Sequence, residues 1–293
     1  MTENSNRYKI IKKIVWVIFF LNLIVALSKI ILGTITKSAS ITADGFHSTG
    51  DAMDNVIGII GLNLASKPKD LDHAYGHEKY ESLASFIVGI ILLLLSVNVI
   101  RDSIDRIINP KVPEISILSF IVMGATIVIN IFVSIYEYNR GKNLESEFLI
   151  ADSLHTRSDI FVSIAVIATI FFVNLGYPVL DTITSIIIAI IIALTGIRVL
   201  NSSAQVLTDR EVMNSKELRE IVVKIPGVKD CHAIRTRGTL SDVKVDLHMT
   251  VDKSMSVDDA HEISERVENA VKEKFNNVSE VIVHIEPYEK TEK

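Results

Sequence analysis

A nine-residue pattern containing possible ligands for a divalent metal occurs twice in the chain. It reads A-D-x-x-H-S/T-x-x-D, at residues 43–51 and again 108 residues later at 151–159. The histidine and the last aspartate are four residues apart, so in a helix they share one face. They are His47 and Asp51 in the first copy, and His155 and Asp159 in the second. Two such faces that meet would form a tetrahedral set of two imidazoles and two carboxylates. This set suits Zn²⁺ well and Fe²⁺, Co²⁺ or Mn²⁺ less selectively.

The elements that must carry these residues are apolar runs long enough to cross a membrane, which takes ~20 mostly apolar residues. Hydrophobic residues make up 48% of the 293 residues, and the mean hydropathy of +0.37 is high for a soluble domain. Six spans are predicted: Ile14–Thr36, Ser38–Ser66, Ser82–Ile100, Ile115–Tyr136, Ile160–Leu180 and Thr182–Ile197. The fifth helix must begin earlier, near Asn143, to hold the second copy of the pattern. We therefore expect a membrane all-α, six-helix transmembrane bundle.

The position of the two copies favours transport over a structural role. The second copy lies three spans after the first, so the halves are inverted in the membrane, as in many transporters. Each intramembrane aspartate costs about 2.5–3.5 kcal/mol on insertion scales, so a duplicated pattern of this kind indicates a function. The alternative is a His–Asp pair that only joins helices by hydrogen bonds. Asp44 and Asp54 share the ligand face and would support the ligands, line a wet cavity or simply be satisfied by neighbouring helices.

Basic residues near the span ends predict the orientation. One side has nine: Arg7, Lys9, Lys12, Lys13, Lys67, Lys69, Lys79, Arg140 and Lys142. The other has four: Lys37, Arg101, Arg106 and Lys111. An even number of spans places both termini on one side, so we expect a multi-pass protein of the cell membrane with N- and C-termini in the cytoplasm.

The last 85 residues differ from the rest, with 14 basic and 18 acidic residues of the chain's 65. The predicted boundary separates a transport domain at 1–208 from a cytoplasmic domain at 209–293. Hydrophobic alternation and turn residues predict an αββαβ module. Its elements are Ser215–Ile225, Val228–Thr236, Val243–Val251, Ser256–Phe275 and Val281–Glu286. In the second strand we expect five apolar side chains to face inward, which places His248 on the outer face.

Two further groups of metal-binding side chains lie outside the predicted spans. Between the second and third spans, Asp70, His73 and His77 could bind one ion, although a solvated, helix-capping loop is the alternative. The tail holds four of the eight histidines, together with Asp246 and Glu286, which favours a cytoplasmic metal cluster. These four are His232, His248, His261 and His284.

The duplicated H-x-x-x-D, the loop D-x-x-H-x-Y-G-H and the αββαβ tail together resemble the cation diffusion facilitator family. The resemblance implies proton-coupled efflux of zinc and related divalent metals by a dimer with a ferredoxin-like, metallochaperone-like tail. It implies a transport site of His47, Asp51, His155 and Asp159, with protons as counter-ion and no organic cofactor.

The resemblance also assigns roles to the remaining candidates. It implies a loop site of Asp70, His73 and His77. It implies a tail site of His232, His248, His261 and His284, with Glu286 where many members have aspartate. Lys79 and Asp209 match positions that join the membrane and tail parts, and they could pair between subunits. The histidine in the second-span pair favours Zn²⁺, and an Fe²⁺, Mn²⁺, Co²⁺ or Cd²⁺ exporter is the alternative.

Other classes of protein fit less well. A zinc protease needs H-E-x-x-H, and the near matches at His77 and His261 have glutamate at the last position, so we expect no enzyme. A net charge of −5 gives no basic face for nucleic acid. A single cysteine, Cys231, excludes an internal disulfide framework and a cysteine-rich zinc module. A metal sensor anchored by its spans would leave the duplicated pattern unexplained. Lipid, divalent cations and a second copy of the chain are the expected partners.

Overall fold

The computed structural model describes residues 2–64, 70–77, 79–109, 112–144, 146–240 and 242–288. The chain divides into two compact units, residues 1–203 and 204–293, which we call the membrane unit and the tail unit. Each unit is described by itself.

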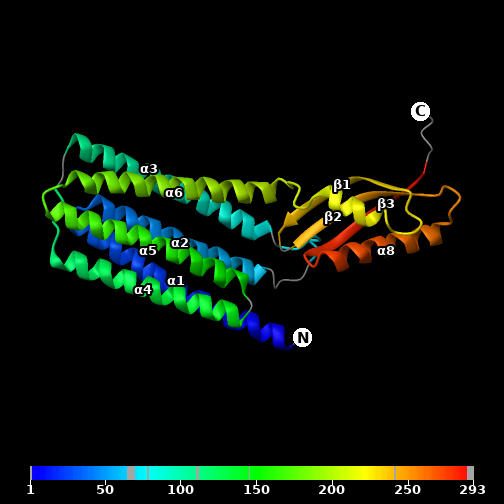
Figure 1. Ribbon diagram of the computed structural model, residues 1–293, viewed down its shortest axis with the longest axis horizontal. Coiled ribbons are helices and arrows are strands. Elements are labelled where there is room, and N and C mark those ends of the chain that lie inside the picture. Colours follow the sequence, from blue (N-terminus) through cyan, green and yellow to red (C-terminus); the bar gives the residue numbers. More distant parts are fainter. Residues whose placement is uncertain are drawn as a thin grey trace. The chain divides into compact units, whose positions relative to one another are not determined.

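Six long helices build the membrane unit (Figure 1). They are α1 (Thr2–Ile35), α2 (Ala39–Leu64), α3 (Lys79–Ile108), α4 (Ile117–Asn143), α5 (Glu147–Asn174) and α6 (Val179–Leu207). Within the described residues, five of them, all except α2, are long and apolar enough to cross a membrane. α2 has 26 residues but carries the acidic side chains and His47 of the first pattern. It packs against α1, α3 and α5, so the polar helix lies within the predicted six-helix bundle.

The ends of the helices depart from the sequence prediction in ways that have local causes. α5 begins at Glu147, not near Asn143, because the Ser146 side chain caps it by accepting from the backbone N–H of Leu149. It ends at Asn174 instead of Leu180, since Gly176 adopts a φ of 97° and Pro178 follows. The helix still starts well before Ile160, so His155 and Asp159 both lie on it.

Small residues allow the helices to approach closely. A Cβ at Gly89 of α3 would lie 2.7 Å from the Leu200 Cγ and 3.1 Å from the Gly196 carbonyl oxygen, both on α6. The Ser96 hydroxyl on α3 donates to the Ala189 carbonyl on α6 at 2.9 Å. In membranes such contacts replace the hydrophobic effect as the force that joins helices.

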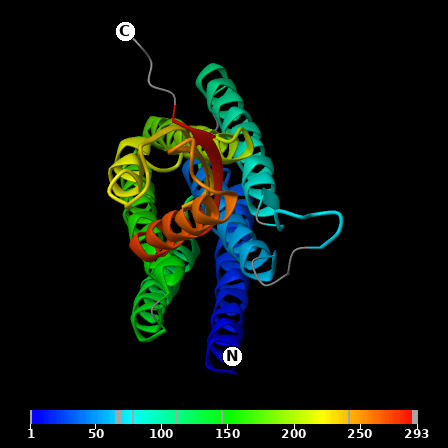
Figure 2. The same ribbon diagram turned by 90° about the vertical axis from the view of Figure 1, so that its right-hand side faces the viewer.

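The tail unit has the predicted αββαβ order. Its elements are α7 (Ser215–Val222), β1 (Asp230–Thr239), β2 (Asp242–Val251), α8 (Val257–Lys274) and β3 (Val278–Pro287). The strand order is β1-β2-β3, with β1 antiparallel and β3 parallel to β2. The parallel pair needs a crossover, and α8 supplies it (Figures 1 and 2).

One face of this sheet forms the core of the tail unit, and the other stays open. Val243, Val245, Leu247, Met249 and Val251 are buried as predicted, in a cluster with the apolar side chains of α7 and α8. Successive side chains of a strand alternate between faces, so His248 lies on the open face. The register places His232, His248 and His284 in one row across the three strands.

Candidate metal centres

The two copies of the duplicated pattern meet between α2 and α5. The His47 Nε2 lies 3.1 Å from the Asp159 Oδ1, and the His155 Nε2 lies 3.2 Å from the Asp51 Oδ1. Each pair therefore takes one residue from each copy. His47, Asp51 and Asp159 are buried, whereas 38% of the His155 side chain is exposed.

Three of the four predicted ligands converge on one point. Single ligand atoms of His47, Asp51 and Asp159 all lie within 4.8 Å of one another. His155 stands beside this group and contacts it through Asp51. The arrangement can offer nitrogen and carboxylate oxygen to a divalent cation from two helices.

A buried ion pair adjoins this group. The Lys29 ammonium on α1 lies 3.0 Å from the Asp44 Oδ2, and both side chains are fully buried. It also donates to Ser48 at 3.0 Å and to Ser163 of α5 at 2.8 Å, so its three protons are satisfied. This ion pair was not predicted from the sequence. The available signal for it was a lysine in one apolar run and an aspartate in the next. Asp44 pairs with Lys29 and is not one of the converging ligands.

The loop residues Asp70, His73 and His77 also come together. The Asp70 Oδ1 lies 3.1 Å from the His73 Nδ1, and its Oδ2 lies 3.2 Å from the His77 Nε2. The backbone N–H of His73 donates to Asp70 and is the main cause that lowers the pKa of this carboxyl group. The His73 Nε2 contacts the Tyr80 hydroxyl at 3.1 Å. Among the described residues the group offers three ligands, which fits a wetter and weaker site.

In the tail unit, Glu286 lies at the centre of the histidine row. Its Oε1 is 2.9 Å from the His248 Nδ1 and 3.7 Å from the His284 Nε2, and its Oε2 is 3.2 Å from the His232 Nε2. The hydrogen bond with His248 is the main cause that lowers the pKa of Glu286, so the carboxylate stays ionised. Despite its additional methylene relative to aspartate, the side chain bridges the row.

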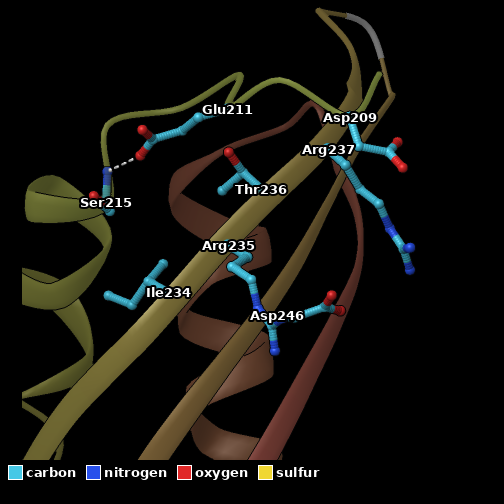
Figure 3. A pocket seen from close by; sticks show the side chains of 8 residues that line it. All are labelled: Asp209, Glu211, Ser215, Ile234, Arg235, Thr236, Arg237 and Asp246. Carbon is cyan, nitrogen blue, oxygen red and sulfur yellow. Dashed lines mark hydrogen bonds between the residues drawn. The ribbon is translucent and has the colours of Figure 1, made fainter. Parts of the chain in front are cut away.

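Two predicted tail ligands do not join this row. His261 is on α8, which packs on the other face of the sheet, and its Nε2 lies 3.5 Å from Glu265 on the same helix. Asp246 pairs with Arg235 in the register of β1 and β2. It lines a groove with Arg235, Arg237 and Asp209, and in Figure 3 its side chain lies beside Arg235.

The two residues expected to join the membrane and tail parts lie in different units. Lys79 begins α3 with an exposed side chain. Asp209 follows α6 in a left-handed conformation with a φ of 54° and lies near Arg237 in Figure 3. Their pairing between subunits stays a prediction.

Comparisons with known proteins agree with this architecture. Residues 15–208 match the family model of the cation efflux transmembrane domain, and residues 212–288 match that of the cation efflux protein cytoplasmic domain. An uncharacterized transporter of Methanocaldococcus jannaschii is 32% identical, covering 90% of this chain and 94% of its own. The manganese efflux system protein MneP of Bacillus subtilis is 29% identical, covering 97% and 98%.

A solved structure also matches the tail. The C-terminal domain of a MamM variant in its cadmium form is 31% identical, covers 26% of this chain and 93% of that one, and has a TM-score of 0.25. The two family models together account for both units of the chain. The chain is therefore a multi-pass membrane protein that belongs to the cation diffusion facilitator family of divalent metal efflux transporters.

Proposed function

We propose that this chain exports Zn²⁺ from the cytoplasm in exchange for protons, using His47, Asp51, His155 and Asp159 as the transport site. The observation that carries the proposal is the crossed pairing of the two patterns between α2 and α5. Intramembrane groups of this kind are costly and mark ion pathways. Inverted repeats place such a site where the halves meet, which suits alternating access from the two sides.

Exchange for protons follows from the chemistry of the ligands. A metal binds neutral imidazole and ionised carboxylate, so its arrival displaces protons. Protons on the far side then compete for the same groups and release the ion. One ligand set thus serves both ions in turn.

The choice of metal rests on the donor atoms. Imidazole nitrogen favours Zn²⁺, while sites rich in carboxylate and carbonyl oxygen suit Mn²⁺. The similar MneP protein is a manganese efflux protein, so Mn²⁺ is the second candidate, followed by Fe²⁺, Co²⁺ and Cd²⁺. Competition between Zn²⁺ and Mn²⁺ for flux in proteoliposomes tests this choice, and preferential Mn²⁺ flux would reverse it.

We further propose a homodimer in the cell membrane with both termini in the cytoplasm. The match of residues 212–288 to the cytoplasmic domain of cation efflux proteins supports a cytoplasmic tail, and the group of His232, His248 and Glu286 supports metal binding there. Metal on the open face of the sheet would join two tails and shift the membrane helices toward one conformation.

The decisive test of the transport site is Asp51→Ala in proteoliposomes with an imposed pH gradient. We expect Zn²⁺ flux to disappear, because the variant removes one of the three converging ligands and the partner of His155. The matched control is Asp72→Ala in the exposed loop, which should leave flux unchanged. Undiminished flux in Asp51→Ala would refute the assignment.

A further inference from the structure

Glu137 of α4 is a fully buried carboxyl group with almost no hydrogen-bond donor. Among the described residues its Oε1 has no partner, and its Oε2 faces only the Thr156 hydroxyl at 3.5 Å. That hydroxyl has one proton and lies closer, at 3.1 Å, to the Asp152 carbonyl oxygen of its own helix. A buried carboxylate needs donors or a cation, and Glu137 faces only this one distant hydroxyl, which is shared with Asp152.

The group that Glu137 does contact is another carboxyl group. Its side chain and that of Asp152 on α5 are in hydrogen-bond contact, and the Asp152 Oδ2 is also buried without a donor from the described residues. Two carboxylate oxygens cannot bond to each other unless one carries a proton. Like charges in such a contact also repel strongly when water is excluded.

The surrounding charges do not relieve this repulsion. The guanidinium of Arg157 on α5 is engaged elsewhere, since it donates to the Ser134 hydroxyl at 3.2 Å and lies over the Tyr138 ring at 4.9 Å. The titratable groups that face the pair from α2 and α5 are mostly acidic. They are Asp51 and Asp54 on α2, and His155 and Asp159 on α5. His155 already contacts Asp51.

We propose that Glu137 and Asp152 share one proton and form a proton-binding site separate from the metal ligands. Asp152 precedes His155 by three residues, so the pair lies about one helical turn from the transport site. A divalent cation at that site would repel the shared proton. The acid O–H bond then breaks, the proton passes to water, and both groups remain as carboxylates. Departure of the cation reverses the step. This coupling rests on the proposed function, whereas the shared proton in the metal-free protein does not.

Infrared difference spectroscopy on the purified full chain without metal tests the shared proton. We expect a carbonyl stretch of a protonated carboxylic acid that shifts in heavy water and is lost in Glu137→Gln. Glu81→Gln is the matched control, since Glu81 is an exposed glutamate at the start of α3. It should keep the band. A wild-type spectrum without the band, or a band unchanged in Glu137→Gln, would overturn the proposal.

Proton release on metal binding tests the coupling. With Zn²⁺ added to weakly buffered protein and a pH indicator, we expect Glu137→Gln to bind the ion yet release one proton fewer per ion than wild type. Asp152→Asn should also release one proton fewer per ion than wild type. This variant replaces Glu137→Gln in the experiment if Glu137→Gln does not fold. Equal release by folded variants would overturn the coupling. If Asp51→Ala binds Zn²⁺ as tightly as wild type, the assignment of the transport site is wrong. This outcome differs from a failure of the coupling, so the two hypotheses are tested separately.

Discussion

At the scale of single residues, Lys29 shows how a charge is accommodated inside the membrane unit. Its ammonium is fully buried and satisfied by Asp44, Ser48 and Ser163 from two other helices. Such a pair contributes little net stability compared with apolar residues, but removing one partner leaves an uncompensated charge.

Lys29→Met should therefore destabilise the membrane unit by about 3–5 kcal/mol, because Asp44 loses its counter-ion in a dry environment. The double variant Lys29→Met with Asp44→Leu should recover most of that loss. Thermal unfolding of the protein in detergent measures both. A single variant as stable as the wild type would show that the pair does not form.

At the scale of elements, a side chain of α6 caps the start of α2. The Asp181 carboxylate accepts from the backbone N–H groups of Ala39 and Ser40 at 2.6 and 3.1 Å. It also accepts from the hydroxyls of Ser38 and Ser40, both at 2.6 Å. This carboxylate satisfies the free donors at the start of the helix and complements its dipole.

Asp181→Ala should cost about 0.5–2 kcal/mol, the usual value of a lost N-cap. Asp181→Asn keeps an acceptor and should cost less. Hydrogen exchange of the first turn of α2 should rise in the alanine variant alone. Equal protection in both variants would argue that other groups cap this helix.

The same elements show what a sequence can predict. Apolar runs and strand alternation identified all six membrane helices and the five tail elements, because both signals are local and periodic. The boundaries were less certain, since a single capping residue such as Ser146 decides where α5 begins. The partners of buried charges were not predictable, because Lys29 and Ser163 are 134 residues apart and only packing joins them.

The candidate sites divide in the same way. The H-x-x-x-D pattern identified the side chains that meet between α2 and α5, because its spacing is about one helical turn. Counting tail histidines did not separate His261 from the row on the open face, since that depends on which side of the sheet α8 covers. Glu137 gave no signal, because it is one acidic residue near the end of an apolar run.

At the scale of the whole molecule, the tail unit has its own hydrophobic core. We expect residues 204–293 to fold and bind Zn²⁺ when expressed alone. The lowered pKa of Glu286 means that its stabilising contacts are present above the ordinary pKa of glutamate and are lost only as pH falls through the lower folded value. Zn²⁺ affinity falls as protons compete for its ligands, so binding should fade in mild acid while Glu286 remains ionised.

Calorimetric Zn²⁺ titrations of the tail unit between neutral and mildly acidic pH measure this. Glu286→Gln should weaken binding throughout without moving the pH at which it fades. The matched control His261→Ala should bind like the wild type, since His261 lies outside the row. Binding that persists until glutamate is protonated would contradict the assignment of the row.

The polar character of α2 has a consequence for how the protein enters the bilayer. Taken alone, this helix is a poor substrate for the insertion machinery, whereas α1 is strongly apolar and packs along it. Lys29 and Asp44 neutralise each other across these two helices. We expect α1 and α2 to leave the translocon together as a preformed hairpin, which glycosylation mapping of nascent chains with and without Lys29 can test. The ion pair would then be required for membrane insertion of the protein, before any cation is transported.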